Sequence, residues 1–268
     1  CPHPCPHPPP RRNVANTRRR EMKLLEWILT IGLGLVFAGC FYGVGATRLI
    51  RQKDYISLLF FFVAHWSFHP LFKALGAFPR QRDVLTRERA SDSYPISAWF
   101  LANLFGEWAV AWAHPLAFYA ICWPIAGIPA ALAPSLYVIT MINYEVSMGV
   151  GNLVAAIVFD SDTARMVAVV LMAFNMLAGG FFVNLANPSL PSWLSSVRHI
   201  SYFTYTFGEY VSRALPAKGE LDVFKATLAG YSFDIDGHLN VAMLCGLGVA
   251  LRLAGFALIV RSRQLRFS

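Results

Sequence analysis

The sequence predicts an all-α integral membrane protein with six transmembrane helices. Hydrophobic residues make up 56% of the chain and charged residues only 14%, whereas soluble domains usually carry about 25% charged residues. The mean hydropathy is +0.47. Long apolar stretches recur between short polar segments, and 268 residues suffice for about six helices of ~20 residues each with their loops.

Charge predicts the topology of these spans. The formal net charge is +8, and basic residues gather in the segments expected inside the cell. With both termini cytoplasmic, 14 Lys and Arg residues lie inside, 7 lie outside, and two fall within spans. The excess of basic residues therefore indicates how the chain is oriented in the membrane and that it contacts anionic lipid headgroups. No basic surface interleaved with aromatic residues is evident, so we expect no nucleic-acid partner.

The chain begins with a low-complexity leader, residues 1–10, of sequence CPHPCPHPPP. Its cysteines and histidines suggest a metal site, but prolines favour an extended chain and structural zinc sites space their ligands more widely. A disordered or artefactual leader is the favoured interpretation. Arg11–Lys23 is strongly basic and predicts a solvated tail or an interfacial helix. The first span, Trp27–Ala46, contains no charged residue.

The second span, Tyr55–Phe78, follows a short hydrophilic hairpin and contains several polar side chains. His65 and His69 lie one helical turn apart on the same face, and Lys73 follows one turn later. Polar groups at membrane depth usually face a cavity or a protein neighbour. The histidines therefore either pack through hydrogen bonds or line a cavity.

A charged block follows the second span. Seven of the fifteen residues from Arg80 to Tyr94 are ionic, and each charge would cost roughly 2.5–3.5 kcal/mol at the centre of a bilayer. The block must therefore lie in water at a membrane face. Val84 and Leu85 fall between the charges, which predicts a short amphipathic helix along the cytoplasmic surface.

Three further spans are expected at Ile96–Trp123, Ser135–Phe159 and Ala164–Val183. Glu107 lies inside the third span, where a carboxylate forms a structural ion pair or helps to couple loop motion to the helices. The loop Asp160–Thr163 has acidic residues suited to capping the N-terminus of span five.

The longest segment without a full span is Leu185–His238. Its apolar pieces are too short to cross a bilayer, so we expect re-entrant external half-helices there. Glu209 and Arg213 are one turn apart and can pair. The sixth span is Leu239–Val260, in which Arg252 needs a partner or a water-filled neighbour.

No catalytic residues are expected on this chain. The sequence contains no G-x-x-x-x-G-K-[S/T] phosphate-binding loop, and Gly149-x-Gly151 is not followed by the required lysine. No recognisable Ser-His-Asp set is present, and the histidines lack further residues that would complete a metal site. The sequence thus predicts no cofactor and no nucleotide-binding domain on this chain.

Several motifs together resemble the G-subfamily (White-type) ABC half-transporters, whose membrane part is an ABC-2 type permease domain. The resemblance covers residues 11–268. The motifs are Phe78-Pro79-x-x-Arg82, Arg87-Glu88-Arg89, Tyr94, Phe100-Leu101-Ala102, Glu107, Pro115 and Gly179-Gly180-Phe181-Phe182-Val183-Asn184. The chain departs from the family pattern at Ala109, where proline is usual, and at Thr204, where arginine is usual.

The resemblance implies roles for individual residues. The charged block would be a coupling helix that touches the ATPase domain, and Phe181-Phe182 would form a gate between an inner and an outer cavity. The implied coupling residues are Arg82, Arg87, Glu88, Tyr94 and Glu107. The implied substrate cavity and gate residues are Trp66, His69, Met176, Phe181 and Phe182.

The resemblance also implies a function and its partners. A homodimer or heterodimer of half-transporters would export lipid, sterol or another amphipathic small molecule, with membrane lipid around it. ATP and Mg²⁺ would act through a nucleotide-binding domain that is missing or separate. One alternative is a truncated, non-transporting subunit that dimerises with full-length half-transporters and regulates them. An ATP-independent channel is disfavoured, since no internal repeat is evident.

Overall fold

The protein was analysed as a computed structural model, which describes residues 11–90, 106, 111–158, 160–183, 191, 196–215 and 237–264. Within these ranges the regular elements are all helices. They agree with the predicted all-α class. Three of them are long and apolar enough to cross a membrane, over Gln52–Ala77, Ser161–Ala178 and Leu239–Leu258. The predicted number of six spans stays a prediction.

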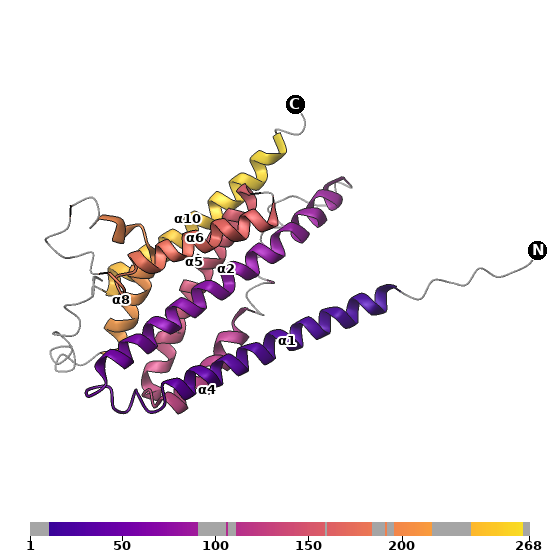
Figure 1. Ribbon diagram of the computed structural model, residues 1–268. Coiled ribbons are helices and arrows are strands. Elements are labelled where there is room, and N and C mark those ends of the chain that lie inside the picture. The colour runs from indigo at the N-terminus through magenta and orange to yellow at the C-terminus, as the bar shows by residue number, and fades with distance from the viewer. Residues whose placement is uncertain are drawn as a thin grey trace, which may run out of the picture.

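The long helices run side by side in one elongated bundle (Figure 1). Helix α2 (Gln52–Ala90) packs against α5 (Ala133–Ile157), and α5 packs in turn against α10 (Gly237–Gln264). Helix α1 (Arg11–Cys40) packs against α4 (Ala113–Ala126). The start of α1, the end of α2 and the end of α10 lie toward the same side of the bundle.

Two further helices complete the bundle. Helix α6 (Ser161–Ala178) contacts α2, and α8 (Tyr202–Ala214) packs against α10, α5 and α2. Helix α8 is 13 residues long, too short to span a bilayer as an α-helix. Ten of its residues from Tyr202 to Val211 are buried without interruption. It is a short buried helix that precedes α10 in the chain, and the predicted re-entrant external placement stays a prediction.

The predicted end of the second span was wrong. We predicted that the second span ends near Phe78 and that a separate coupling helix follows it. Instead α2 continues without a break to Ala90. The residues from Arg80 to Ala90 are mostly good helix formers and include no glycine or proline, so nothing in them forces the helix to stop. Residues 91–105 lie outside the described ranges.

Two other predicted ends were also wrong: α1 ends at Cys40, six residues before the predicted end of the first span, and α6 ends at Ala178, five residues before the predicted end of span five. The boundaries of α5 agree more closely. Helix α5 begins two residues before the predicted span and ends two residues before its predicted end.

Helix α4 ends at Ala126 and is capped by Gly127, whose φ of 72° is the left-handed conformation that favours glycine. Asp160 caps α6 by accepting a hydrogen bond of 2.8 Å from the Thr163 amide, which confirms the predicted cap.

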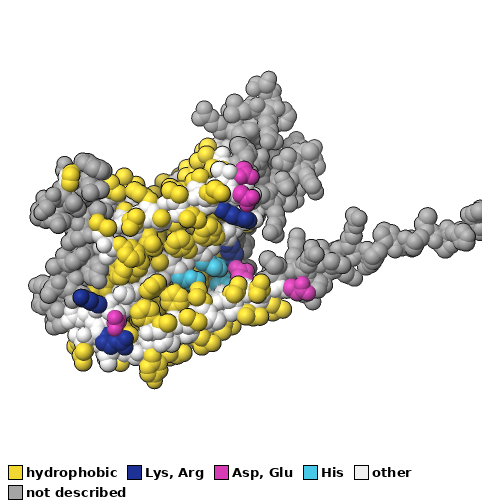
Figure 2. Space-filling view, in the orientation of Figure 1, with side chains coloured by type: hydrophobic (Ala, Val, Ile, Leu, Met, Phe, Trp, Pro, Cys, Tyr) yellow, Lys and Arg dark blue, Asp and Glu magenta, His cyan; other side chains and the backbone are white. Residues whose placement is uncertain are grey.

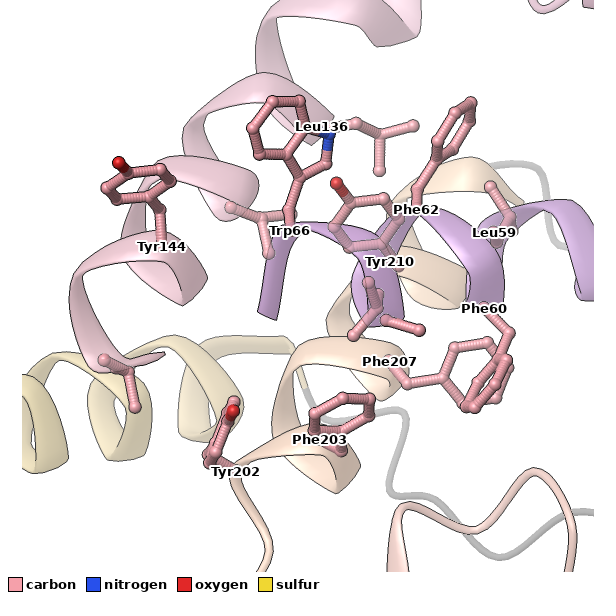
Figure 3. Packing of buried hydrophobic residues seen from close by; sticks show 14 of the residues in the cluster. Leu59, Phe60, Phe62, Trp66, Leu136, Tyr144, Tyr202, Phe203, Phe207 and Tyr210 are labelled. Carbon is pink, nitrogen blue, oxygen red and sulfur yellow. The ribbon is translucent and has the colours of Figure 1, made fainter. Parts of the chain in front are cut away.

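The core is built on α2, α5 and α8 and is rich in aromatic rings. Figure 3 shows Trp66 and Phe62 of α2 close to Tyr210 of α8, with Tyr144 of α5 to one side. Four of the largest side chains in this region are almost fully buried: Tyr144, Trp66, Phe62 and Tyr210.

Polar groups in the core are paired between these helices. The Thr206 hydroxyl of α8 donates to the Asn143 Oδ1 of α5 at 3.1 Å, and the Asn143 Nδ2 donates to Ser67 Oγ of α2 at 2.9 Å. Thr140 of α5 hydrogen-bonds to Tyr210 of α8. Such buried bonds fix how neighbouring helices sit against each other, because an unpaired polar group is costly there.

Candidate functional site: an aromatic cluster and an ionic cluster along α2

The aromatic cluster forms where α6 ends. The helix stops at Ala178, and Gly180 then adopts a φ of 81°, a left-handed conformation that suits glycine. This turn presents Phe181 to α2, where its ring stacks on Phe60 with centroids 4.1 Å apart and planes 11° apart. Phe182 meets the same ring edge-on at 5.3 Å and is 54% exposed.

Helix α8 supports this cluster from the other side. Phe207 meets Phe60 and Phe181 edge-on at 5.5 and 5.8 Å. The Thr204 hydroxyl donates to the Ala178 carbonyl at 3.0 Å, so the position that departs from the family pattern anchors the end of α6. We define the aromatic cluster as Phe60, Phe181, Phe182 and Phe207.

Sequence reasoning found half of the aromatic cluster. The Gly-Gly-Phe-Phe motif identified Phe181 and Phe182, but Phe60 and Phe207 were missed. Phe60 lies in a run of three phenylalanines, and such a run does not show which ring meets another helix. Met176, the remaining α6 residue predicted for the cavity, is partly buried against the hydrophobic core.

The ionic cluster lies farther along α2, toward its charged end. Glu26 of α1 accepts a hydrogen bond of 3.0 Å from Lys73 Nζ of α2. The Nε2 atoms of His69 and His114 lie 3.7 and 3.8 Å from the same carboxylate oxygen. Trp27 stacks on His114 at 4.3 Å. One carboxylate therefore faces basic groups from both α2 and α4. We define the ionic cluster as Glu26, His69, Lys73 and His114.

This cluster is partly open to the outside of the protomer. The side chains of Glu26, His69 and Lys73 are 31%, 22% and 29% exposed. Figure 2 shows histidines together with an acidic and a basic side chain within a largely apolar face. Lys73 was expected, like the other polar groups of the second span, to face a cavity or a protein neighbour. Glu26 was missed as that neighbour because it precedes the predicted first span.

The predicted cavity residues fall into separate groups. Phe181 and Phe182 lie in the aromatic cluster, and His69 lies in the ionic cluster. Trp66 is fully buried and packs edge-on against His69 at 5.5 Å. His65 stacks on Phe118 at 5.1 Å, so both histidines of α2 pack while remaining partly exposed.

The predicted coupling residues are only partly covered by the structure. Arg82, Arg87 and Glu88 lie on the helical backbone of α2, but their side chains are outside the described part. Tyr94 and Glu107 lie entirely outside it. Their predicted roles stay predictions.

Two further ion pairs confirm expectations from the sequence. Arg252 Nη2 of α10 donates to Glu145 Oε2 of α5 at 2.7 Å, which supplies the partner expected for a mid-span arginine. Arg213 Nε donates to Glu209 Oε1 at 2.5 Å. Within the described ranges, no group of three histidine, cysteine or acidic side chains is placed to hold a metal ion.

Comparison with known proteins places this arrangement in a family. Residues 11–212 match the family described as ABC-2 type transporter. ABC transporter G family member 25 of Arabidopsis thaliana is 30% identical over 244 residues, which cover 87% of this chain and 36% of the relative. Member 22 from the same plant is 30% identical over 208 residues, covering 76% and 26% respectively. Protein white of Drosophila melanogaster is 26% identical over 183 residues, covering 66% and 25%.

These matches cover only part of each relative, so the chain spans about a quarter to a third of the length of these proteins. The family match nevertheless covers more than half of this chain and includes the helices that carry both clusters. The chain therefore belongs to the ABC-2 type transporter family, in its G subfamily, and forms an integral membrane domain of the kind found in these ABC transporters.

Proposed function

We propose that this domain forms the membrane path of an ATP-driven exporter for amphipathic small molecules such as lipids or sterols. The observation that carries the proposal is the stacking of Phe60 on Phe181. It links the end of α6, where the proposed gate lies, to a helix that extends into the charged block. The gate is thereby in contact with the element expected to receive the force of the ATPase domain.

Continuous helix α2 supports this route. Phe60 and Arg82 lie 22 positions apart on one helix, which corresponds to about 33 Å at 1.5 Å per residue. A continuous helix can carry a displacement from one end to the other, and Pro70 and Pro79 are the positions at which it can bend. ATP-driven closure of the nucleotide-binding domains would push on the charged block through Arg82, Arg87, Glu88 and Tyr94. Phe60 would then shift against Phe181 and Phe182 and open the gate outward.

The active assembly would be a dimer with another half-transporter, either the same or a different one. Its ATPase domains would bind ATP and Mg²⁺, and the domain described here would contribute six spans with both termini cytoplasmic. Glu107 would couple loop motion to the helices. The substrate would meet His69 and Met176 on its way to the gate, a soft and aromatic surface that suits flat molecules. Trp66 would hold His69 in place from the core.

The gate is tested by replacing both phenylalanines. The double substitution Phe181→Ala and Phe182→Ala removes the two motif rings that contact Phe60, and we expect altered substrate selectivity or a leak while the protein still folds. Export by the full-length protein would be measured in vesicles with and without ATP. Phe174→Ala is a matched control, because Phe174 is an exposed α6 ring outside the aromatic cluster. Unchanged export and unchanged leak in the double variant would remove the gate assignment.

A further inference from the structure

The partly exposed face of α2 carries aromatic side chains along its length and a lysine at one end. Phe61, His65, Phe68, His69, Phe72 and Lys73 are all exposed or half-buried, and their spacing of three to four residues places them on one helical face. Phe61 and Phe72 are the most exposed of its rings, at 44% and 36%. His65 stacks on Phe118, and Phe61 also packs against Phe37 of α1. The charged end of the face alone carries a lysine, which lies beside Glu26 of α1. A ligand along this face would meet rings over most of its length and polar groups at one end.

The charge of that polar end is balanced. Glu26 contributes one negative charge and Lys73 one positive charge, while His69 and His114 add none when neutral. Within a bilayer an unbalanced charge is expensive and attracts its opposite strongly, because the surrounding dielectric constant is low. The site formed by Glu26 and Lys73 can therefore bind an uncharged polar group and remain neutral overall. An anion would compete with Glu26 for Lys73 and leave the site negative.

We propose that Glu26 is a specificity-determining residue that makes this site select uncharged amphipathic molecules over anionic ones. The inference rests on the proposed function, since it assigns the polar end of the same substrate path. The favoured ligand class is a flat apolar body that carries a hydroxyl or carbonyl group. Its body would lie along the rings of α2, and its polar group would reach Lys73 and His69.

The test compares two probes that share one skeleton, uncharged 1-pyrenebutanol and anionic 1-pyrenebutyrate. Binding to the full-length protein in lipid nanodiscs would be measured by energy transfer from tryptophan to pyrene, without ATP. Each probe partitions into the lipid equally for every variant, so the informative quantity is the ratio of the two dissociation constants, Kd of the anion divided by Kd of the alcohol. We expect this ratio to be well above one for the unaltered protein.

The variants separate charge from mere structural damage. Glu26→Gln keeps the shape of the side chain but leaves Lys73 unbalanced, so we expect the ratio to fall roughly tenfold, as one buried charge at short range allows. Lys73→Met should raise the ratio. The double variant Glu26→Gln with Lys73→Met is again neutral, and the ratio should return close to that of the unaltered protein.

A matched control uses the other interhelical ion pair. Glu145→Gln breaks the contact with Arg252 between α5 and α10 but leaves the α2 face intact, so the ratio should stay unchanged. The proposal is overturned if Glu26→Gln leaves the ratio unchanged, if Glu145→Gln shifts it equally, or if the double variant keeps the shifted ratio. Absence of pyrene binding to the unaltered protein would also overturn it.

The proposed export function is tested separately, with the same purified protein reconstituted in liposomes. ATP-driven export of 1-pyrenebutanol from liposomes tests transport, whereas the ratio of dissociation constants tests the site. Export with no change of ratio in Glu26→Gln would reject the site and retain the exporter. A shifted ratio without any ATP-driven export would retain the site and reject the exporter.

Discussion

Gly151 shows how one residue sets the distance between two helices. A Cβ atom at this position would lie 2.6 Å from the Leu71 carbonyl oxygen and 2.8 Å from Ala74 Cβ, both on α2. Only a residue without a side chain permits such a close approach. The Gly149-x-Gly151 pattern is not a phosphate-binding loop, because no lysine follows it. Its second glycine instead allows the two helices to pack closely. This contact joins α5 to the helix that carries both clusters.

We predict that Gly151→Ala destabilises the domain by about 1–3 kcal/mol, because the added methyl group must displace α2 backbone. Gly246→Ala is the control, since Gly246 has no atom within 4 Å of a Cβ built on it and alanine favours a helix by up to about 1 kcal/mol. Thermal unfolding in detergent measures both. Equal stability of the two variants would contradict the close α2–α5 contact.

Asn143 carries a second residue-level prediction. Its side chain bonds to both Ser67 and Thr206, so Asn143→Ala leaves two buried hydroxyl groups without these contacts. We expect a loss of about 1–3 kcal/mol of unfolding free energy. Asn175→Ala is the control, because Asn175 Nδ2 bonds to the Leu171 carbonyl of its own helix. Chemical unfolding in detergent distinguishes them, and similar losses would argue against a structural polar core.

At the level of elements, sequence patterns predicted those helix positions and caps that depend on neighbouring residues in the chain. The Asp160 cap and the positions of α5 and α10 follow from capping residues and apolar runs. The end of α2 was misplaced, because a charged block leaves the membrane without having to leave the helix. Phe60 and Glu26 were missed for another reason. Their roles depend on which helix lies opposite, and one sequence holds no information on that pairing.

The Asp160 cap has a pH dependence of known sign. Hydrogen bonds from the Thr163 hydroxyl and amide lower the pKa of the Asp160 carboxyl below its usual 3.8. A lowered pKa means that the carboxylate stabilises the fold at neutral pH and that this contribution is lost as pH falls through the folded-state pKa. Asp160→Ala should therefore lower thermal stability at pH 7, with a difference from the unaltered protein that shrinks toward pH 3.

Asp160→Asn supplies the matched variant for this cap. Asparagine caps a helix about as well as aspartate but does not ionise. We expect thermal stability at pH 7 close to that of the unaltered protein and a weaker decline on acidification. A pH profile of Asp160→Asn identical to that of the unaltered protein would show that the carboxylate at this cap makes no pH-dependent contribution.

At the scale of the whole molecule, the proposed route depends on the angular relation between the two ends of α2. Inserting one alanine after Gly76 would rotate the charged block by about 100° relative to Phe60, whereas inserting four would leave it rotated by about 40°. We expect the single insertion to abolish export by the full-length protein while ATP hydrolysis persists. The four-residue insertion should retain more export, and equal export by both would contradict a rigid α2.

The central claim is that ATP binding moves the gate next to Phe60. The most direct test is a pulsed electron paramagnetic resonance measurement of the distance between spin labels at Val183 in the two protomers of the full-length protein. Val183 follows the gate and is 42% exposed, so it accepts a label. The account predicts a dipolar signal from a dimer and a longer distance when ATP and vanadate are added. An unchanged distance under conditions in which ATP is hydrolysed would contradict it.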